Sequence, residues 1–284
     1  MSMEVTEIDK DFCLSISIFY SQDSWHKLIS KGLIPFYDKQ LGPNNYFYLL
    51  NKNRGDHIAL FLIIQRSKTI EVVKDCDNHF KKFLSSNPSS INSVFQTGSK
   101  IFCDFENNTV HYGLYNGEIY AKHIAVYKRI SKILSFSFEE YADMTIEYLP
   151  EIVLDLLIKL YVFSEKDKDE VLNNFKKTLA REFGKLENRN LSVVKKHLHK
   201  FYLANRNTVA SLIDKERKTT NLKRTQKYLV DILELRKEMN VDTGFILNSL
   251  CDFFGLENIE KMSLFYLISN CVISKEKFDS KHNA

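Results

Sequence analysis

The chain has 284 residues, of which 44% are hydrophobic, and it contains only 9 glycines and 4 prolines. This composition excludes collagen-like, linker-rich and disordered classes, and it predicts a globular protein with a substantial core. The 40 basic and 36 acidic residues nearly balance and leave a net charge of +4.

No targeting or membrane segment is expected. Residues 1–11 carry acidic side chains and no basic stretch that leads into an apolar run, so they do not resemble a signal peptide. The longest apolar run, Ile58–Ile64, is about a third of the roughly 20 residues that a membrane-spanning helix needs. The five cysteines form no C-x-x-C pair, which argues against a disulfide framework or a zinc site. We therefore expect a cytoplasmic protein.

The first 135 residues are predicted to interleave strands and helices. Apolar and small polar side chains alternate over residues 12–20, the two-residue period of a half-buried strand. Two apolar runs around an Asn-Arg-Gly-Asp turn predict a buried hairpin. In chain order we expect a strand at 12–20, a helix at 24–39, hairpin strands at 46–51 and 57–64, a helix at 70–85, and strands at 101–106 and 110–114.

The rest of the chain is predicted to be mostly helical, because apolar residues recur three and four positions apart. No proline follows Pro150 and no repeat is visible, so a single α+β domain over 1–284 is preferred to two separable domains. Its strand-rich region would span 12–135 and its helical region 138–274. The expected helices lie at 139–164, 167–185, 193–216, 220–239, 243–254 and 257–272.

Basic residues are concentrated between Lys176 and Lys237, where 17 Lys or Arg stand against 6 Asp or Glu, a local excess of +11. A basic helical surface attracts phosphate backbones and acidic peptides alike. Such a charge run is equally typical of a solvated helix face without any partner. The sequence leaves these interpretations open.

Standard catalytic motifs are absent. There is no glycine-rich dinucleotide motif, P-loop, zinc-protease motif or nucleophile elbow. His197 and His199 lie two positions apart on a predicted helix, so their side chains point away from each other and are not expected to share an ion. We therefore expect no metal and no cofactor.

Residues 105–115 bring together groups that exchange protons near neutral pH. Glu106, His111, Tyr112 and Tyr115 lie close in sequence, and a carboxylate, an imidazole and phenols are the usual acid–base groups. The alternative is that the tyrosines are half-buried sheet aromatics and His111 a surface histidine.

Three segments, taken in order, resemble the C-terminal domain of class I lantibiotic dehydratases, which also occurs as free-standing thiopeptide-type bacteriocin biosynthesis proteins. The first is the hairpin, with an aromatic-rich strand, Gly55 in the turn and His57 after it. The second has Phe105-Glu106 and then His111-Tyr112-Gly113-Leu114. The third is Ser263-Leu264-Phe265-Tyr266, followed by Asn270-Cys271.

The departures from the family pattern fall mainly on charged residues. The family strand reads His-x-Arg-x-Arg, and this chain has Ala59 and Phe61 in place of the arginines. His111 replaces another arginine, Leu114 a glycine, and Tyr266 a histidine. In the dehydratases this domain removes glutamate from glutamylated Ser or Thr, with arginines binding the departing carboxylate. Without that guanidinium fork, glutamate elimination is doubtful here.

The same family contains the pyridine synthases of thiopeptide biosynthesis, which also replace the elimination residues. They join two dehydroalanines of a modified precursor peptide in a formal [4+2] cycloaddition, and then expel water and the leader peptide. The resemblance thus implies a cofactor-independent macrocyclase. It implies Tyr266, His111, Tyr112, Glu106 and His57 as catalytic acid–base groups, and Tyr115, Ser269, Asn270, Lys195 and Lys196 as substrate-binding residues.

The implied partner is a ribosomal precursor peptide, with its leader and dehydrated core, and neither nucleic acid nor a membrane. Contacts with other biosynthetic enzymes of the pathway, and a homodimer, are left open. Three alternatives remain: a stand-alone glutamate-elimination domain of a split dehydratase, a non-catalytic leader-binding scaffold, and a nucleic-acid-binding helical protein motivated by the basic segment alone.

Overall fold

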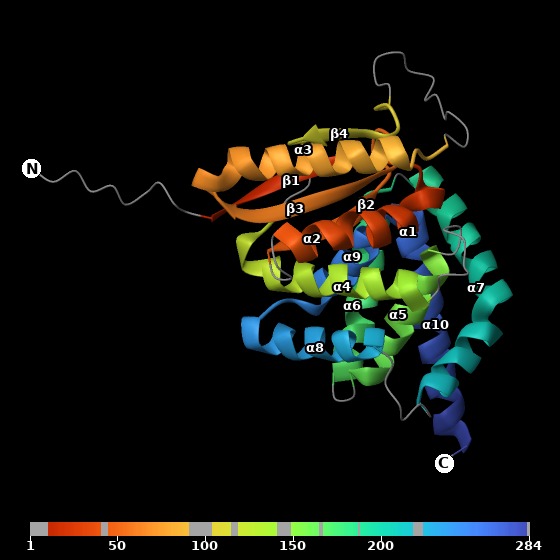
Figure 1. The fold of residues 1–284 in the computed structure, drawn as a ribbon. Helices are drawn as coiled ribbons and strands as arrows, with labels where there is room; N and C mark the ends of the chain where they lie inside the picture. The colour runs from red at the N-terminus through yellow and green to blue at the C-terminus, as the bar shows by residue number, and fades with distance from the viewer. Residues whose placement is uncertain are drawn as a thin grey trace, which may run out of the picture. The chain divides into compact units, whose positions relative to one another are not determined.

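The structure is a computed structural model that describes residues 11–40, 45–90, 104–114, 119–140, 149–164, 167–186, 188–217 and 224–282. It divides into two compact units, Met1–Ile146 and Glu147–Ala284. The first contains a sheet with helices, and the described part of the second is helical (Figure 1). The α+β class expected from the sequence is therefore confirmed, while the expectation that 1–284 forms one domain stays a prediction.

The first unit is built on a four-stranded antiparallel sheet in the order β2-β3-β1-β4. The expected strands at 12–20, 46–51, 57–64 and 110–114 are confirmed. The strand expected at 101–106 is not formed over 104–106, and 101–103 lie outside the described residues. The strands are β1 (Asp11–Phe19), β2 (Tyr46–Asn51), β3 (His57–Gln65) and β4 (Thr109–Tyr112).

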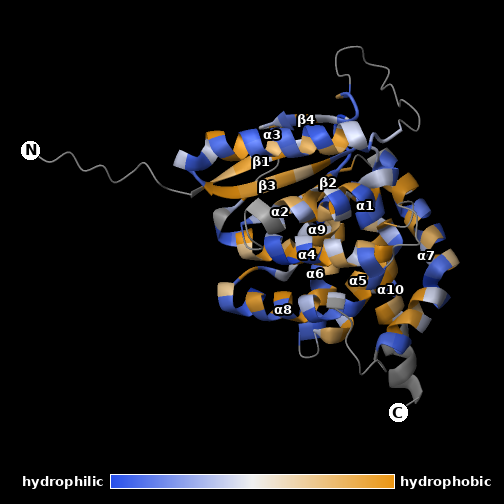
Figure 2. Ribbon diagram, viewed as in Figure 1, coloured by the Kyte–Doolittle hydropathy of each residue, from blue (hydrophilic) through white to orange (hydrophobic). Residues whose placement is uncertain are grey.

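The strand register decides which side chains share a face of the sheet. Ser17 of β1 lies opposite both Ala59 and His111, and Phe19 lies opposite His57. Since successive residues of a strand face opposite sides, these five residues line one face. The other face carries Ile16, Ile18, Leu60 and Tyr112 and meets α3 (Thr69–Ser86), which runs along the sheet in Figure 1. The buried strands are the apolar centre of this unit (Figure 2).

The helical stretch expected at 24–39 is present, but it is not uniform. A 3-10 turn (Gln22–Ser24) leads into α1 (Trp25–Lys27), a π-helical segment (Leu28–Leu33) and α2 (Ile34–Gln40). Gly32 lies in the π segment, where a Cβ atom would come within 2.9 Å of Leu28. Its carbonyl oxygen accepts a hydrogen bond from His79 Nε2 of α3 at 2.8 Å, which ties the two helical stretches together.

One helix of the first unit was missed. Helix α4 spans Ile124–Glu140, where no helix was expected, and the helix expected at 139–164 is present only from Leu149 within the described residues. A further helix, α5, then begins at Leu149, and the segment between them lies outside the described residues. The helix expected at 70–85 is confirmed as α3. Two 3-10 turns, Arg66–Lys68 and Ala121–His123, precede α3 and α4.

The second unit packs helices around α5, of which most residues are buried. Helix α7 runs beside α10 (Figure 1). The helices expected after residue 166 are all present; α7 begins five residues earlier than expected, and α10 continues past Val272. The helices are α5 (Leu149–Phe163), α6 (Lys168–Gly184), α7 (Asn188–Arg217), α8 (Arg224–Met239), α9 (Thr243–Phe253) and α10 (Asn258–His282).

A buried arginine fixes three helix ends in this unit. Arg236, near the end of α8, donates to Asp167 and Glu170 at the start of α6 and to Thr243 at the start of α9. The hydrogen bond from Arg236, followed by that from Thr243, lowers the pKa of Glu170. A hydrogen bond from Lys237 lowers the pKa of Asp167, so both acids stay charged and hold the first turns of α6 and α9 in place.

No described helix is both long and apolar enough to cross a membrane.

Candidate functional site

Two of the histidines singled out from the sequence meet at one end of the sheet. The ring of Phe19 lies 4.6 Å from that of His57 and 5.4 Å from that of His111, measured between centroids. Phe105 lies 4.9 Å from Phe19 and 4.5 Å from His111, and the guanidinium of Arg54 sits 4.3 Å from the Phe105 centroid. We refer to these five residues as the histidine–aromatic cluster.

The hairpin turn places His57 and Arg54 in this cluster. Arg54 and Gly55 have positive φ angles of 62° and 111°, which reverse the chain between β2 and β3. Glycine suits the second position because residues with a side chain rarely adopt such a φ angle, and a Cβ atom there would lie 3.4 Å from the Phe19 ring. The carbonyl oxygen of Arg54 accepts a hydrogen bond from the backbone N–H of Phe105 at 2.9 Å. This hydrogen bond therefore joins the hairpin turn to the segment before β4 and fixes their relative position.

A second set of hydrogen bonds fixes the segment before β4. The Asn107 amide donates to both oxygens of Ser89, and the Asn108 side chain accepts from the Ser89 backbone N–H at 2.8 Å. Asn108 adopts a φ of 62°, a conformation that asparagine tolerates better than most residues. Phe105 and Glu106 are thereby held next to His111.

His57 is arranged as a neutral base. Its ring is buried, and Nδ1 lies 2.9 Å from the carbonyl oxygen of Gly55. Because a carbonyl can only accept, Nδ1 carries the proton and Nε2 keeps a lone pair. Burial lowers the pKa of His57, and the hydrogen bond to Gly55 offsets part of that effect. The imidazole is thus an uncharged proton acceptor at neutral pH.

His111 is oriented by a short hydrogen-bond relay. The Thr109 hydroxyl donates its single proton to the carbonyl oxygen of Glu106 at 2.6 Å, and it lies 3.0 Å from His111 Nε2. Thr109 must therefore accept from His111, which places the histidine proton on Nε2 and the lone pair on Nδ1. The side chain of Glu106 is exposed. The main-chain carbonyl oxygen of Glu106, and not its carboxylate, therefore sets the tautomer of His111.

The two positions at which the sequence resemblance expects arginines lie on the same face as this cluster. Ala59 and Phe61 are both buried there, and Ser17 stands between Ala59 and His111. The Ser17 hydroxyl is buried and makes no hydrogen bond within the described part of the chain. Nothing in the sequence pattern singled out Ser17 or Arg54. The only available signal for Arg54 was its place beside the turn glycine.

Tyr112 does not join the two histidines. Its hydroxyl donates to Asp77 Oδ1 of α3 at 2.7 Å, with the Val73 carbonyl oxygen 3.3 Å away, so it faces the opposite side of the sheet. Burial raises the pKa of Tyr112, and the hydrogen bond to the Asp77 carboxylate raises it further. The phenol is therefore held in its protonated form. Tyr115 lies outside the described residues.

In the second unit, Tyr266 is half-buried on α10 and packs edge-on against Tyr202 of α7, with centroids 6.3 Å apart. Its hydroxyl makes no hydrogen bond with the residues that the structure describes, which leaves it available for a ligand. Asn270 donates to the Tyr266 carbonyl oxygen at 2.8 Å, so its amide is used within its own helix. The buried Ser269 hydroxyl has no partner in the described segments. Whether Tyr266 shares a cavity with His111 stays a prediction.

Lys195 and Lys196 lie on the exposed side of α7, and Lys195 Nζ is 5.5 Å from the Phe183 ring centroid. His197 and His199 are also exposed on this helix. Among the described residues, no group of three or more His, Cys, Asp or Glu side chains is close enough to hold a metal ion.

Comparison of the sequence with family models and with curated proteins finds no match. Solved structures do match. One is described as "Pyridine synthase, TbtD, from thiomuracin biosynthesis"; it has a TM-score of 0.67 and 11% identity over 91% of this chain and 97% of that one. This chain has the fold of a pyridine synthase. A second structure, TsrL, has a TM-score of 0.61 and 11% identity, with 95% and 96% of the two chains covered. The fold implied by the sequence resemblance is thus confirmed.

Proposed function

We propose that this chain is a thiopeptide macrocyclase that forms a pyridine from two dehydroalanines of a modified precursor peptide. The observation that carries the proposal is the fold shared with a pyridine synthase over 91% of this chain and 97% of the other. The replacement of the elimination arginines by Ala59 and Phe61 supports it as well, because both residues are buried on the face that carries His57 and His111.

The proposed reaction needs proton transfers that this chain's residues can supply. A base removes the proton of the amide N–H between the diene carbons and an acid protonates its carbonyl oxygen, which gives the azadiene tautomer. Two new bonds then close the six-membered ring. Loss of water from the former amide oxygen, followed by loss of the leader peptide, leaves the aromatic pyridine. We assign base roles to His57 Nε2 and His111 Nδ1, and a proton-donor role to Tyr266.

The rest of the proposal concerns the substrate and its surroundings. The precursor peptide is the proposed partner, and Lys195 and Lys196 are proposed to attract an acidic leader. Glu106, Tyr112, Tyr115, Ser269 and Asn270 remain proposed contributors; of these, Tyr112 acts through the sheet rather than by contact with His111. The reaction needs no cofactor, and we place the protein in the cytoplasm.

Incubation of the purified chain with a dehydrated precursor peptide tests the proposal. Mass spectrometry should detect a macrocycle that has lost water, together with the free leader in equal amount. A glutamylated peptide serves as the control substrate and should remain intact. Release of glutamate without macrocycle would instead assign the chain to elimination.

One observation favours glutamate elimination as a second candidate. Arg54 brings a guanidinium over Phe105, within the histidine–aromatic cluster, where a departing carboxylate could be held. An Arg54→Gln variant separates the two functions, because it should abolish carboxylate binding while leaving a cycloaddition largely intact. Leader binding without any turnover of either substrate would identify a scaffold protein.

A further inference from the structure

The second unit contains a pocket of about 630 Å³ between α6, α9 and α10. This volume lies within the roughly 300–1,000 Å³ of typical ligand sites. No residue that the sequence singled out individually lines this pocket. Lys177, Arg181 and Lys185 line it and belong to the basic segment between Lys176 and Lys237. The pocket therefore needs its own explanation.

One wall is a regular series of cations. Lys177 and Arg181 stand four residues apart on α6 and Lys185 follows as its C-cap, so the three recur at intervals of roughly 6 Å along the helix axis. Only one carboxylate, Glu182, lines the pocket from the same helix. Burial tends to raise its pKa, but hydrogen bonds from Lys185 and Arg181 outweigh this and lower it. The wall thus carries three positive charges against one negative charge.

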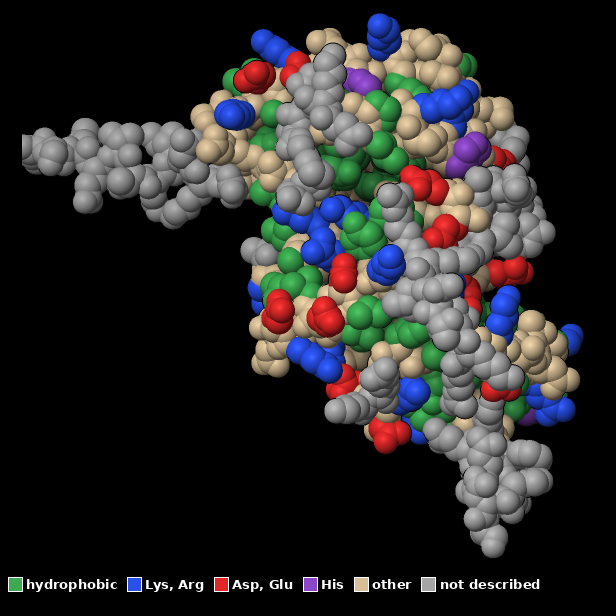
Figure 3. All heavy atoms as spheres, turned by 60° about the horizontal axis from the view of Figure 1, so that its bottom comes forward, with side chains coloured by type: hydrophobic (Ala, Val, Ile, Leu, Met, Phe, Trp, Pro, Cys, Tyr) green, Lys and Arg blue, Asp and Glu red, His purple; other side chains and the backbone are tan. Residues whose placement is uncertain are grey.

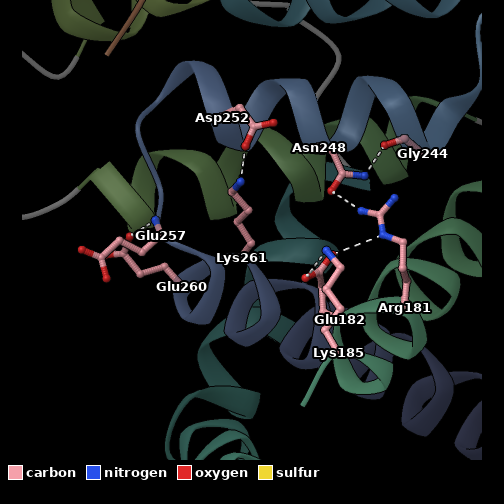
Figure 4. A network of polar contacts seen from close by, with 9 residues as sticks. All are labelled: Arg181, Glu182, Lys185, Gly244, Asn248, Asp252, Glu257, Glu260 and Lys261. Atoms are coloured by element: carbon pink, nitrogen blue, oxygen red, sulfur yellow. Dashed lines mark hydrogen bonds and ion pairs between the residues drawn. The ribbon is translucent and has the colours of Figure 1, made fainter. Parts of the chain in front are cut away.

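Much of this positive charge is not used within the protein. Lys177 makes no hydrogen bond or ion pair with the described residues. Arg181 donates from Nε to Glu182 at 3.2 Å and from Nη2 to Asn248 at a long 3.4 Å, which leaves other N–H groups of the guanidinium free (Figure 4). Lys185 is paired to both oxygens of Glu182 and serves mainly to hold that carboxylate.

The opposite wall and the floor are different in character. The side chain of Asn248 on α9 accepts a hydrogen bond from Arg181 and donates one to the Gly244 carbonyl oxygen at 2.6 Å (Figure 4). Its amide therefore has a fixed orientation. Lys261 and Asp252 form an ion pair and neutralise each other, and the carboxylate of Asp242, which also lines the pocket, accepts from the Phe245 backbone N–H. Met262 and Phe265, both buried, supply an apolar floor.

Contacts within the protein hold the walls of the pocket in place. The Arg236 network fixes the starts of α6 and α9, and Asp242 caps α9 by accepting from the Phe245 backbone N–H. On the face drawn in Figure 3, basic and acidic side chains are interspersed rather than gathered in one patch. No broad basic patch is therefore visible on that face.

We infer that this pocket binds a peptide segment that carries two carboxylates one helical turn apart and an apolar side chain on the same face. Carboxylates at positions i and i+4 of a helix have the same roughly 6 Å rise as Lys177 and Arg181, and the apolar side chain would meet the floor. This inference rests on the proposed function for the identity of the segment, which would then belong to the leader peptide. It adds a specific contact at α6 to the general attraction of an acidic leader that is proposed for Lys195 and Lys196 on α7.

A fluorescent, helix-forming peptide with Glu at i and i+4 and a leucine on the same face is the probe. Its binding to the full chain is measured by fluorescence anisotropy at low and physiological salt. The Lys177→Gln/Arg181→Gln variant should bind at least about tenfold more weakly, since two charge-assisted contacts are lost. Lys74→Gln/Lys82→Gln removes the same charge from exposed positions on α3 and should bind within about twofold of wild type. Melting temperatures confirm that both variants fold.

Changes in the peptide complete the test. Replacing both Glu by Gln, or the leucine by Ser, should weaken binding to the wild type, and moving the second Glu to i+2 should do the same. The inference is overturned if the wild type does not bind the probe, if both double variants weaken binding equally, or if the i+2 peptide binds as well. Macrocycle formation is assayed separately, so that failure of binding at α6 is distinguished from failure of the proposed reaction.

Discussion

His111 and Tyr112 are neighbours in β4, yet they face opposite sides of the sheet. His111 lies opposite Ser17 and packs on Phe19, whereas Tyr112 lies opposite Ile16 and bonds Asp77 of α3. The two-residue period of a strand makes this unavoidable. Two residues that were expected to act together therefore lie in separate surroundings, and only His111 is on the face of the proposed chemistry.

Tyr112→Phe should affect stability more than turnover. The variant loses the hydrogen bond to Asp77, and a half-buried bond of this kind contributes about 1 kcal/mol to the free energy of unfolding. Asp77 keeps its ion pair with Lys81, so no charge is left unpaired. Urea unfolding should show the loss, while kcat for macrocycle formation should stay within about twofold. A large fall in kcat with unchanged stability would show instead that the Tyr112 hydroxyl takes part in the reaction.

The sequence was sufficient for the elements whose pattern is local. The hairpin was predicted to the residue at β2 and at the start of β3, because two apolar runs flank a turn with Gly55. Helix α4 was missed although Val126, Tyr127, Ile130 and Leu134 repeat at helical spacing. The π segment at Leu28–Leu33 has no such local signal, since it depends on packing against α3.

The candidate site was predictable only in part. His57 and His111 were found from residue type and family position, but their tautomers follow from backbone carbonyls that no sequence pattern marks. Arg54 and Ser17 were passed over, since their place in the site is set by strand register and turn geometry. The pocket on α6 depends on three helices that are distant in sequence, so its cations looked like an ordinary solvated charge run.

Acidification should destabilise the chain through His57. Burial lowers the pKa of this imidazole below the ordinary value of 6.5, so the unfolded chain binds a proton before the folded chain does. The free energy of unfolding should therefore be fully retained above about pH 6.5 and should fall as the pH drops toward the folded-state pKa, by at most about 1.4 kcal/mol per pH unit. Urea unfolding between pH 7.5 and 5 measures this slope.

A His57→Gln variant is the control for that slope. His123 also has a lowered pKa, caused by burial and then by Lys122, and its contribution should persist in the variant. The slope should therefore decrease without vanishing. Identical slopes for the wild type and the variant would show that His57 does not titrate between the folded and unfolded states.

Ser17→Ala and Ser137→Ala form a matched pair. Both hydroxyls are buried and have no hydrogen-bond partner among the described residues, so removing either should raise the free energy of unfolding by about 1 kcal/mol. Only Ser17 shares a sheet face with His57 and His111. We expect kcat/KM to fall for Ser17→Ala and to stay unchanged for Ser137→Ala. Equal kcat/KM values for the two variants would show that Ser17 contributes to packing alone.

Tyr266→Phe tests the proposed proton donor. The change removes one oxygen that bonds no described residue, and the edge-on contact with Tyr202 is kept, so fold and leader affinity should be preserved. If the hydroxyl moves a proton in the cycloaddition or the later eliminations, product formation should slow by about 10²- to 10⁴-fold, the usual contribution of a positioned acid or base. Mass spectrometry of the macrocycle measures the rate, with the melting temperature as the folding control.

Tyr202→Phe, which loses a hydroxyl bonded to Ser274 on the same pair of helices, is the matched variant and should keep its rate. A fully active Tyr266→Phe protein would reduce Tyr266 to a packing aromatic and leave the proton donor to be sought elsewhere, with the proposed macrocyclase function still standing.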